Sequence, residues 1–170
     1  LACDIILTEG IELAASLWRV DRRFVPAAIA EKSPRVSIHL PTYNEPPQMV
    51  IETVDALAGL DYDDFEVIVL DNNTPDPPAW RPVEAHCKTL GPRFRFFHFD
   101  HVKGFKAGAL QAGLAAQAYP YVAILDADYR PSRDFLRRCV PPLMADPRLG
   151  YCQARWDFLN AAENRLTGIQ

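Results

Sequence analysis

The sequence predicts an α/β domain with a mostly parallel sheet flanked by helices, and three observations lead to that prediction. From residue 35 onward, short apolar runs alternate with segments of helical periodicity. Apolar residues make up 49% of the 170 residues, which suffices for one domain with a hydrophobic core. Polar residues follow the ends of the predicted strands, where ligands bind in sheets of this kind.

Nine elements are expected in this part of the chain. Apolar runs rich in branched or aromatic side chains predict strands, and apolar residues spaced three or four apart predict helices. Prolines 77 and 78 suit the start of the second helix. In chain order we expect a strand at Val36–Leu40, a helix at Pro46–Leu60, a strand at Glu66–Leu70, a helix at Trp80–Leu90, a strand at Phe94–Phe99, a helix at Phe105–Ala118, a strand at Tyr121–Leu125, a helix at Arg133–Met144 and a strand at Gly150–Trp156.

Residues 1–34 are predicted to form an amphipathic helix and a linker ahead of the domain at residues 35–170. Polar residues recur there at four-residue intervals, which places them on one stripe of a helix. They are Asp4, Thr8, Glu12 and Ser16. Acidic residues disfavour a membrane-spanning helix, so packing on the domain is the preferred interpretation and a position on a membrane surface is the alternative.

The composition excludes some functions. The net charge is -4 and no cluster of Lys and Arg is present, so nothing supports binding to nucleic acid. The four cysteines lack C-x-x-C spacing, which is typical of isolated thiols in a reducing compartment. His86, His98 and His101 show no metal-ligand pattern, so surface or core roles are expected for them.

Two carboxylates, Asp126 and Asp128, directly follow the predicted strand at Tyr121–Leu125. Residues two apart in an extended chain face the same way, so both carboxylates can converge on a divalent cation. A solvated turn with Asp128 as a helix cap is the alternative. Lys106 stands among glycines at a predicted helix start, where backbone N–H groups and an ammonium group can bind a phosphate. Neither a P-loop nor a Rossmann fingerprint is present.

Polar and aromatic groups also follow the first two predicted strands. Asp71 can accept hydrogen bonds from a base or ribose, or it can cap its own turn. Tyr43 can stack on a planar base or serve in packing, and Glu45 can simply favour the following helix N-terminus. A base platform, a lysine for phosphate and a carboxylate pair for a cation together indicate a nucleoside-diphosphate site.

The chain resembles the family-2 inverting glycosyltransferases of GT-A (Rossmann-like) fold, which are often processive membrane enzymes. Four motifs in the family's order carry the resemblance over residues 35–170: Pro-Thr-Tyr-Asn-Glu at 41–45, Asp-Asn-Asn at 71–73, Lys-Ala-Gly-Ala-Leu at 106–110 and Asp-Ala-Asp at 126–128. Residues 71–87 look most like bacterial cellulose and β-glucan synthases. Residues 151–160 are also similar to glucomannan and mannan synthases.

The resemblance implies transfer of glucose from a UDP-sugar donor to a growing β-glucan acceptor, with inversion and with Mg²⁺ or Mn²⁺. It also implies a full-length protein embedded in the membrane, acting at its cytoplasmic face. The residues it implies for the nucleotide-sugar are Thr42, Tyr43, Glu45, Asp71, Lys106 and Asp126, and those for the metal are Asp126 and Asp128.

One departure limits the expected activity. The family's T-E-D base motif and its Q-x-x-R-W acceptor motif are both absent. The run from Gln153 to Trp156 is similar to the acceptor motif but is one residue too short. We therefore expect a donor-binding half of the catalytic domain, truncated on its C-terminal side and inactive alone in polymer synthesis, with the base further along. A sugar nucleotidyltransferase and a non-catalytic nucleotide-sugar-binding module are the alternatives.

Overall fold

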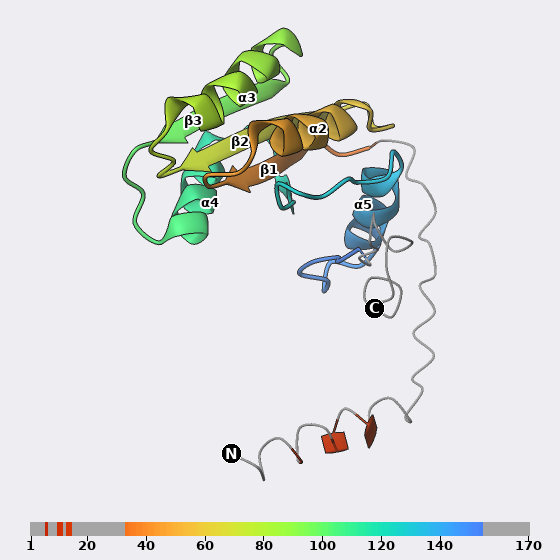
Figure 1. Cartoon of the computed structure of the whole chain (residues 1–170). Helices are drawn as coiled ribbons and strands as arrows, with labels where there is room; N and C mark the ends of the chain where they lie inside the picture. Colours follow the sequence, from red (N-terminus) through yellow and green to blue (C-terminus); the bar gives the residue numbers. More distant parts are fainter. Residues whose placement is uncertain (1–5, 7–9, 12, 15–32, 155–170) are drawn as a thin grey trace, which may run out of the picture.

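The computed structural model describes residues 6, 10–11, 13–14 and 33–154. Within them, a sheet of parallel strands has the order β3-β2-β1-β4 and is flanked by helices (Figure 1). The strands are β1 (Val36–Thr42), β2 (Phe65–Asn72), β3 (Phe94–Phe99) and β4 (Tyr121–Ile124). The helices are α2 (Pro47–Ala58), α3 (Pro77–Thr89), α4 (Phe105–Ala116) and α5 (Phe135–Ala145). The α/β class and the parallel sheet expected from the sequence are confirmed.

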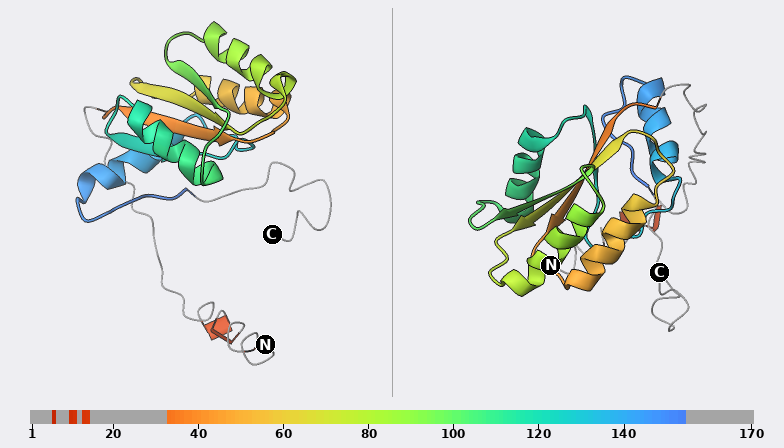
Figure 2. Two further views of the ribbon diagram at one scale, coloured as in Figure 1. Left: turned by 90° about the vertical axis from the view of Figure 1, so that its left-hand side faces the viewer. Right: turned by 90° about the horizontal axis from the view of Figure 1, so that it is seen from above.

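The two central strands are buried along their whole length. Helices cover both faces of the sheet, with α4 on one side and α2 and α3 on the other (Figure 2). Strands covered on both faces lose the alternation of polar and apolar residues, which explains the near-continuous apolar runs in β1 and β2. The main core lies on the α2 side and includes Ile38, Leu57 and Leu136, whereas Ile68, Leu70 and Ala109 form a smaller core under α4.

The close approach of α4 to the sheet depends on Gly113. A Cβ at this position would touch the side chains of Leu70 and His39, so any other residue would push the helix outward. His39 is fully buried beneath it, and neither ring nitrogen has a hydrogen-bond partner within the described part of the chain. Burial lowers the pKa of His39, and the nearby charge of Glu66 partly opposes that shift.

The strand order places the candidate site. From β1 the chain runs outward through β2 to β3, and β4 then pairs with the other side of β1. The topology therefore switches direction between β1 and β4, and ligands of such sheets bind in the crevice outside the carboxyl ends of the strands at that point. Thr42 at the end of β1 stands opposite Asp71 in the register, so these two predicted binding residues share this edge.

The prediction of a strand at Gly150–Trp156 is wrong for the residues that the structure describes, 150–154. These residues have no regular secondary structure, and Tyr151 is 79% exposed. A strand needs a neighbour for its backbone N–H and C=O groups. Within the described part of the chain, β4 pairs with β1 only, so residues 150–154 lack that neighbour.

The predicted N-terminal helix falls mostly outside the described residues. Those that are described, 6, 10–11 and 13–14, are helical. Over the described parts of the chain, no helix combines the length and the apolar character that crossing a bilayer requires.

Candidate functional site

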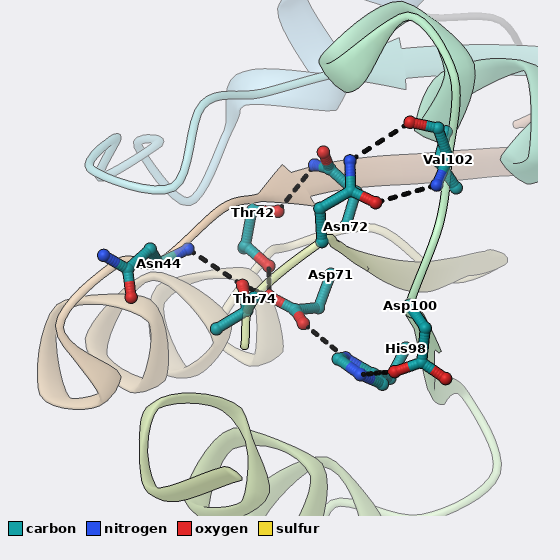
Figure 3. Close-up of polar contacts among 9 residues, drawn as sticks. Thr42, Asn44, Asp71, Asn72, Thr74, His98, Asp100 and Val102 are labelled. Atoms are coloured by element: carbon teal, nitrogen blue, oxygen red, sulfur yellow. Dashed lines mark hydrogen bonds and ion pairs between the residues drawn. The ribbon is translucent and has the colours of Figure 1, made fainter. Parts of the chain in front are cut away.

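Asp71 lies at the centre of a buried polar network at the carboxyl end of β2 (Figure 3). Its Oδ1 accepts hydrogen bonds from the hydroxyls of Thr42, at 3.1 Å, and Thr74, at 2.7 Å. Its Oδ2 lies 2.6 Å from Nδ1 of His98. With only 3% of its surface exposed, Asp71 faces protein groups in this conformation, so its predicted contact with a base remains a prediction.

His98 connects Asp71 to the surface. Its Nδ1 faces Asp71, its Nε2 lies 3.1 Å from Oδ1 of Asp100, and its ring stacks on Trp80 of α3 at a centroid distance of 4.2 Å. The imidazole is therefore held by two carboxylates and one aromatic ring. The sequence predicts only a surface or core role for His98, because its histidines show no metal-ligand pattern; the signal that it lies on the same edge as Asp71 is its place at the end of β3.

Asn73 fastens the loop that leads into α4. Its side-chain amide donates to the carbonyl of Val102 at 3.1 Å, and its Oδ1 accepts the Val102 backbone N–H at 2.7 Å (Figure 3). The backbone N–H of Asn73 also donates to Phe99 O at 2.8 Å. Three hydrogen bonds thus tie the end of β2 to the segment between β3 and Lys106.

Backbone strain is concentrated at this edge of the sheet. Asn44, Asn73 and Phe105 have φ values of 52°, 56° and 49°. They lie after β1, after β2 and at the start of α4. Left-handed conformations are uncommon for residues other than glycine and cluster at functional sites. Phe105 is the clearest case, since it is a bulky residue in this conformation and 67% exposed.

Gly108 lets the same loop rest against the first turn of α4. A Cβ at this position would overlap the carbonyl of Lys103 and the side chain of Val102. The loop before Lys106 is therefore held on one side by the Asn73 amide and on the other by the bare backbone of Gly108. Both contacts fix where α4 begins, and with it the position of Lys106.

Lys106 and Asp126 meet across the topological switch point. The ammonium group of Lys106 donates to Oδ1 of Asp126, and both side chains are about half exposed. Asp128 is exposed, while Ala127 between them is buried. Burial and the charges of Asp126 and Asp128 raise the pKa of Tyr129, against the opposing charge of Lys106. The structure thus brings together three of the predicted phosphate and metal residues.

The remaining predicted residues follow β1. Thr42 is buried and donates to Asp71, so it serves the network beneath the site in this conformation. Tyr43 is 52% exposed and Glu45 is partly exposed. The backbone N–H of Asn44 donates to Thr74 Oγ1 at 2.9 Å, which joins this loop to the loop after β2. Tyr43 is therefore presented beside the network on a fixed loop.

The carboxylates of Asp126 and Asp128 suit a divalent cation whose other ligands come from a substrate and from water. Carboxylate oxygens are the ligands that Mg²⁺ and Mn²⁺ prefer. Among the described residues, no group of three or more His, Cys, Asp and Glu side chains is arranged to hold a metal ion, so a complete protein cage is not formed there. Proteins usually bind Mg²⁺ through one or two carboxylates, and substrate phosphates and water supply the other ligands.

Comparison with known proteins identifies the family. Residues 37–165 match the family described as glycosyl transferase family 2. The chain belongs to this family. Membership favours the glycosyltransferase hypothesis over the nucleotidyltransferase and the non-catalytic module that the sequence left open.

Three relatives of this family-2 chain are informative. The probable glucomannan 4-beta-mannosyltransferase 3 of Oryza sativa subsp. japonica is 39% identical over 145 residues, which cover 81% of this chain and 26% of the rice protein. A mannosyltransferase from Pyrobaculum calidifontis, solved with GDP-Man and Mn²⁺, is 33% identical with a TM-score of 0.66 over 88% of this chain and 45% of that one.

The third relative is the glucosyl-3-phosphoglycerate synthase of Mycobacterium tuberculosis, solved with Mn²⁺, UDP and glucosyl-3-phosphoglycerate. It is 26% identical with a TM-score of 0.51 over 65% of this chain and 40% of that one. The chain spans about a quarter of the length of the curated relatives it matches. The GT-A fold expected from the sequence is confirmed by these structural matches.

Proposed function

We propose that this family-2 chain binds GDP-mannose with a divalent cation and directs its mannosyl group to a β-linked glycan acceptor. The observation that carries the proposal is its likeness, over most of its length, to a mannosyltransferase solved with GDP-Man and Mn²⁺. The plant relatives support the same sugar, since they are named as glucomannan mannosyltransferases.

This proposal replaces the glucose and UDP expected from the sequence. The sequence contains the motifs of the donor site, and Tyr43 and Asp71 predict a uracil base, but it carries no readable signal for the sugar. The rice relative and the Pyrobaculum calidifontis structure are both named as mannosyltransferases, so mannose is the better-supported sugar, and GDP is the nucleotide bound by the structure with 33% identity. UDP is retained as the competing nucleotide, because a more distant structural relative binds it.

The chemistry begins with the charge of the leaving nucleoside diphosphate. We infer that Asp126 and Asp128 hold the cation and that Lys106 turns from Asp126 to the diphosphate when donor binds. When bound, a divalent cation neutralises part of the charge on the leaving group. In the absence of donor, Lys106 instead balances the charge of Asp126, which lowers the repulsion between this carboxylate and nearby negative charges.

The acceptor side of the reaction is part of the same proposal. An acceptor hydroxyl attacks the anomeric carbon from the face opposite the diphosphate, which inverts the configuration there. Removal of its proton requires a general base, typically worth about 10²–10⁴-fold in rate. Embedding of the whole protein in a membrane, with the site at the cytoplasmic face, is proposed from the family resemblance alone.

Titration calorimetry with GDP-mannose and UDP-glucose, each with and without Mn²⁺, tests the donor. We expect tighter binding of GDP-mannose and a loss of affinity when Mn²⁺ is removed. Asp126→Asn should remove most of the gain in affinity that Mn²⁺ provides, because it replaces a charged oxygen ligand with a neutral amide. Asp146→Asn is the matched control, since its carboxylate pairs with Arg148 beyond α5.

Two results would contradict the proposal separately. Tighter binding of UDP-glucose than of GDP-mannose would overturn the donor assignment. Equal GDP-mannose affinity with and without Mn²⁺ would overturn the cation assignment at Asp126 and Asp128.

A further inference from the structure

Thr53, on the buried face of α2, touches the backbone of the Asp126-Ala127-Asp128 turn. Its side chain is fully buried, and its hydroxyl lies 2.5 Å from the carbonyl oxygen of Ala127 and 3.1 Å from the carbonyl of Met49. A hydroxyl has one hydrogen to donate, and the Ala127 carbonyl is the nearer acceptor. Thr53 thus contacts the peptide group between Ala127 and Asp128, next to one of the two predicted metal carboxylates.

Arg130 fixes the direction of that hydroxyl. One guanidinium nitrogen of Arg130 donates to Thr53 Oγ1, and the other donates to Glu52 Oε2 at 2.6 Å. Hydrogen bonding to Arg130 lowers the pKa of Glu52, so this partner stays charged. Because Arg130 can only donate, it occupies the lone pair of Thr53 and leaves the hydroxyl hydrogen for a carbonyl.

The turn itself is short and well supported. The backbone N–H of Tyr129 donates to Asp126 O at 3.1 Å, which closes the turn around Ala127 and Asp128. The Ala127 side chain is buried in the main core. With its side chain in the core and its carbonyl held by Thr53, Ala127 fixes the backbone from which the two flanking aspartates extend.

We propose that Thr53, oriented by Arg130, is a positioning residue that sets the geometry of Asp126 and Asp128 for a divalent cation. The inference rests on the proposed function, because it takes these two carboxylates as the cation ligands. Outer-shell partners of metal ligands typically change metal affinity by about 10–100-fold when removed. Thr53 acts one step further out, through the backbone rather than through the carboxylates themselves.

The test compares Thr53→Val with Thr53→Ser in the full chain. Valine keeps the shape and loses the hydroxyl, whereas serine keeps the hydroxyl. Binding of GDP is measured by calorimetry across a Mn²⁺ series, together with the thermal midpoint of each variant. We expect Thr53→Val to need about 10-fold more Mn²⁺ for half-maximal GDP affinity, with metal-free GDP binding unchanged and Thr53→Ser close to wild type.

The control is Thr89→Val in α3, whose hydroxyl donates only to His86 O of its own helix. A lower thermal midpoint with an unchanged Mn²⁺ requirement in Thr53→Val would overturn the inference and leave the proposed function intact. A wild-type chain whose GDP binding ignores Mn²⁺ would overturn both.

Arg130→Gln keeps the test decisive if Thr53→Val does not fold. It leaves the hydroxyl of Thr53 in place and removes the group that orients it. We expect a rise of several-fold in the Mn²⁺ requirement, smaller than for Thr53→Val. An unchanged requirement in Arg130→Gln would overturn the orienting role of Arg130.

Discussion

The two ends of β2 each carry a buried carboxylate, and their partners differ in kind. Near the amino end, Glu66 accepts hydrogen bonds from Ser37, from the backbone N–H of Ala118 at 2.7 Å and from Arg95 at 3.2 Å. At the carboxyl end, Asp71 is bound by two hydroxyls and an imidazole. A backbone amide and a guanidinium can only donate, whereas hydroxyls and imidazole can also accept.

This difference separates a structural joint from an adaptable site. Glu66 joins β2 to the residues just after α4, and Arg95 strengthens the joint by donating to Ala116 O at 2.8 Å. Burial alone would raise the pKa of Glu66, but hydrogen bonds from Ala118, Ser37 and Arg95 outweigh it and lower the pKa. The partners of Asp71 can reverse their hydrogen bonds, so the network there can rearrange around a ligand.

Glu66→Gln is the change with the largest expected effect. The new amide N–H₂ would face the guanidinium of Arg95, which offers no acceptor. We expect the free energy of unfolding to fall by about 1.5–3 kcal/mol, the range for hydrogen bonds to charged groups. Urea unfolding measures it, with Glu84→Gln on the surface of α3 as the control. A loss no larger than that of the control would show that the joint at Glu66 is not structural.

Asp71→Asn is the matched change at the other end of the strand. An amide N–H₂ there can donate to His98, whose ring can present a lone pair, so we expect a loss of unfolding free energy below about 1 kcal/mol. Nucleotide affinity should nevertheless fall about tenfold, since the charge beneath the predicted base site is gone; tenfold corresponds to about 1.4 kcal/mol. Calorimetry with GDP checks this. A larger loss of stability than in Glu66→Gln would remove the contrast between the two ends.

The smallest effect concerns pH, and it links Glu66 to His39. The pKa of His39 is lowered by burial, so the unfolded chain binds the proton more readily than the folded chain. Stability should therefore fall as pH drops below about 6.5, by at most about 1.4 kcal/mol per pH unit, until the pH passes the folded pKa. The charge of Glu66 raises the pKa of His39, and Glu66→Gln removes it. In this variant the fall in stability should therefore continue to lower pH.

Urea unfolding between pH 5 and 8 measures the slope. His39→Gln should flatten it, and His101→Gln, an exposed position, serves as the control. An equal slope in His39→Gln and wild type would assign the pH dependence to other groups.

The sequence predicts the elements and the edge that carries the site because both depend on local patterns. Apolar runs and helical spacing lie within short windows, and strand ends follow from them, so Lys106 and Asp126 could be placed on one edge without a structure. The contact of Thr53 with Ala127 joins residues 74 positions apart and leaves no local signal. The same limit explains why the strand prediction is wrong at residues 150–154, since an apolar run does not reveal whether a neighbouring strand is available.

Gly108 has a consequence for how related sequences are read. Replacing glycine with alanine inside a helix normally stabilises it by about 0.5–1 kcal/mol, so drift toward alanine would be favoured at an unconstrained position. Here a single methyl group would displace the Val102–Lys103 backbone. A homologue that keeps Lys106 but carries alanine at 108 must have rebuilt the preceding loop. Glycine at position 108 is therefore a stricter marker than Lys106 that the loop at residues 102–103 has kept this conformation.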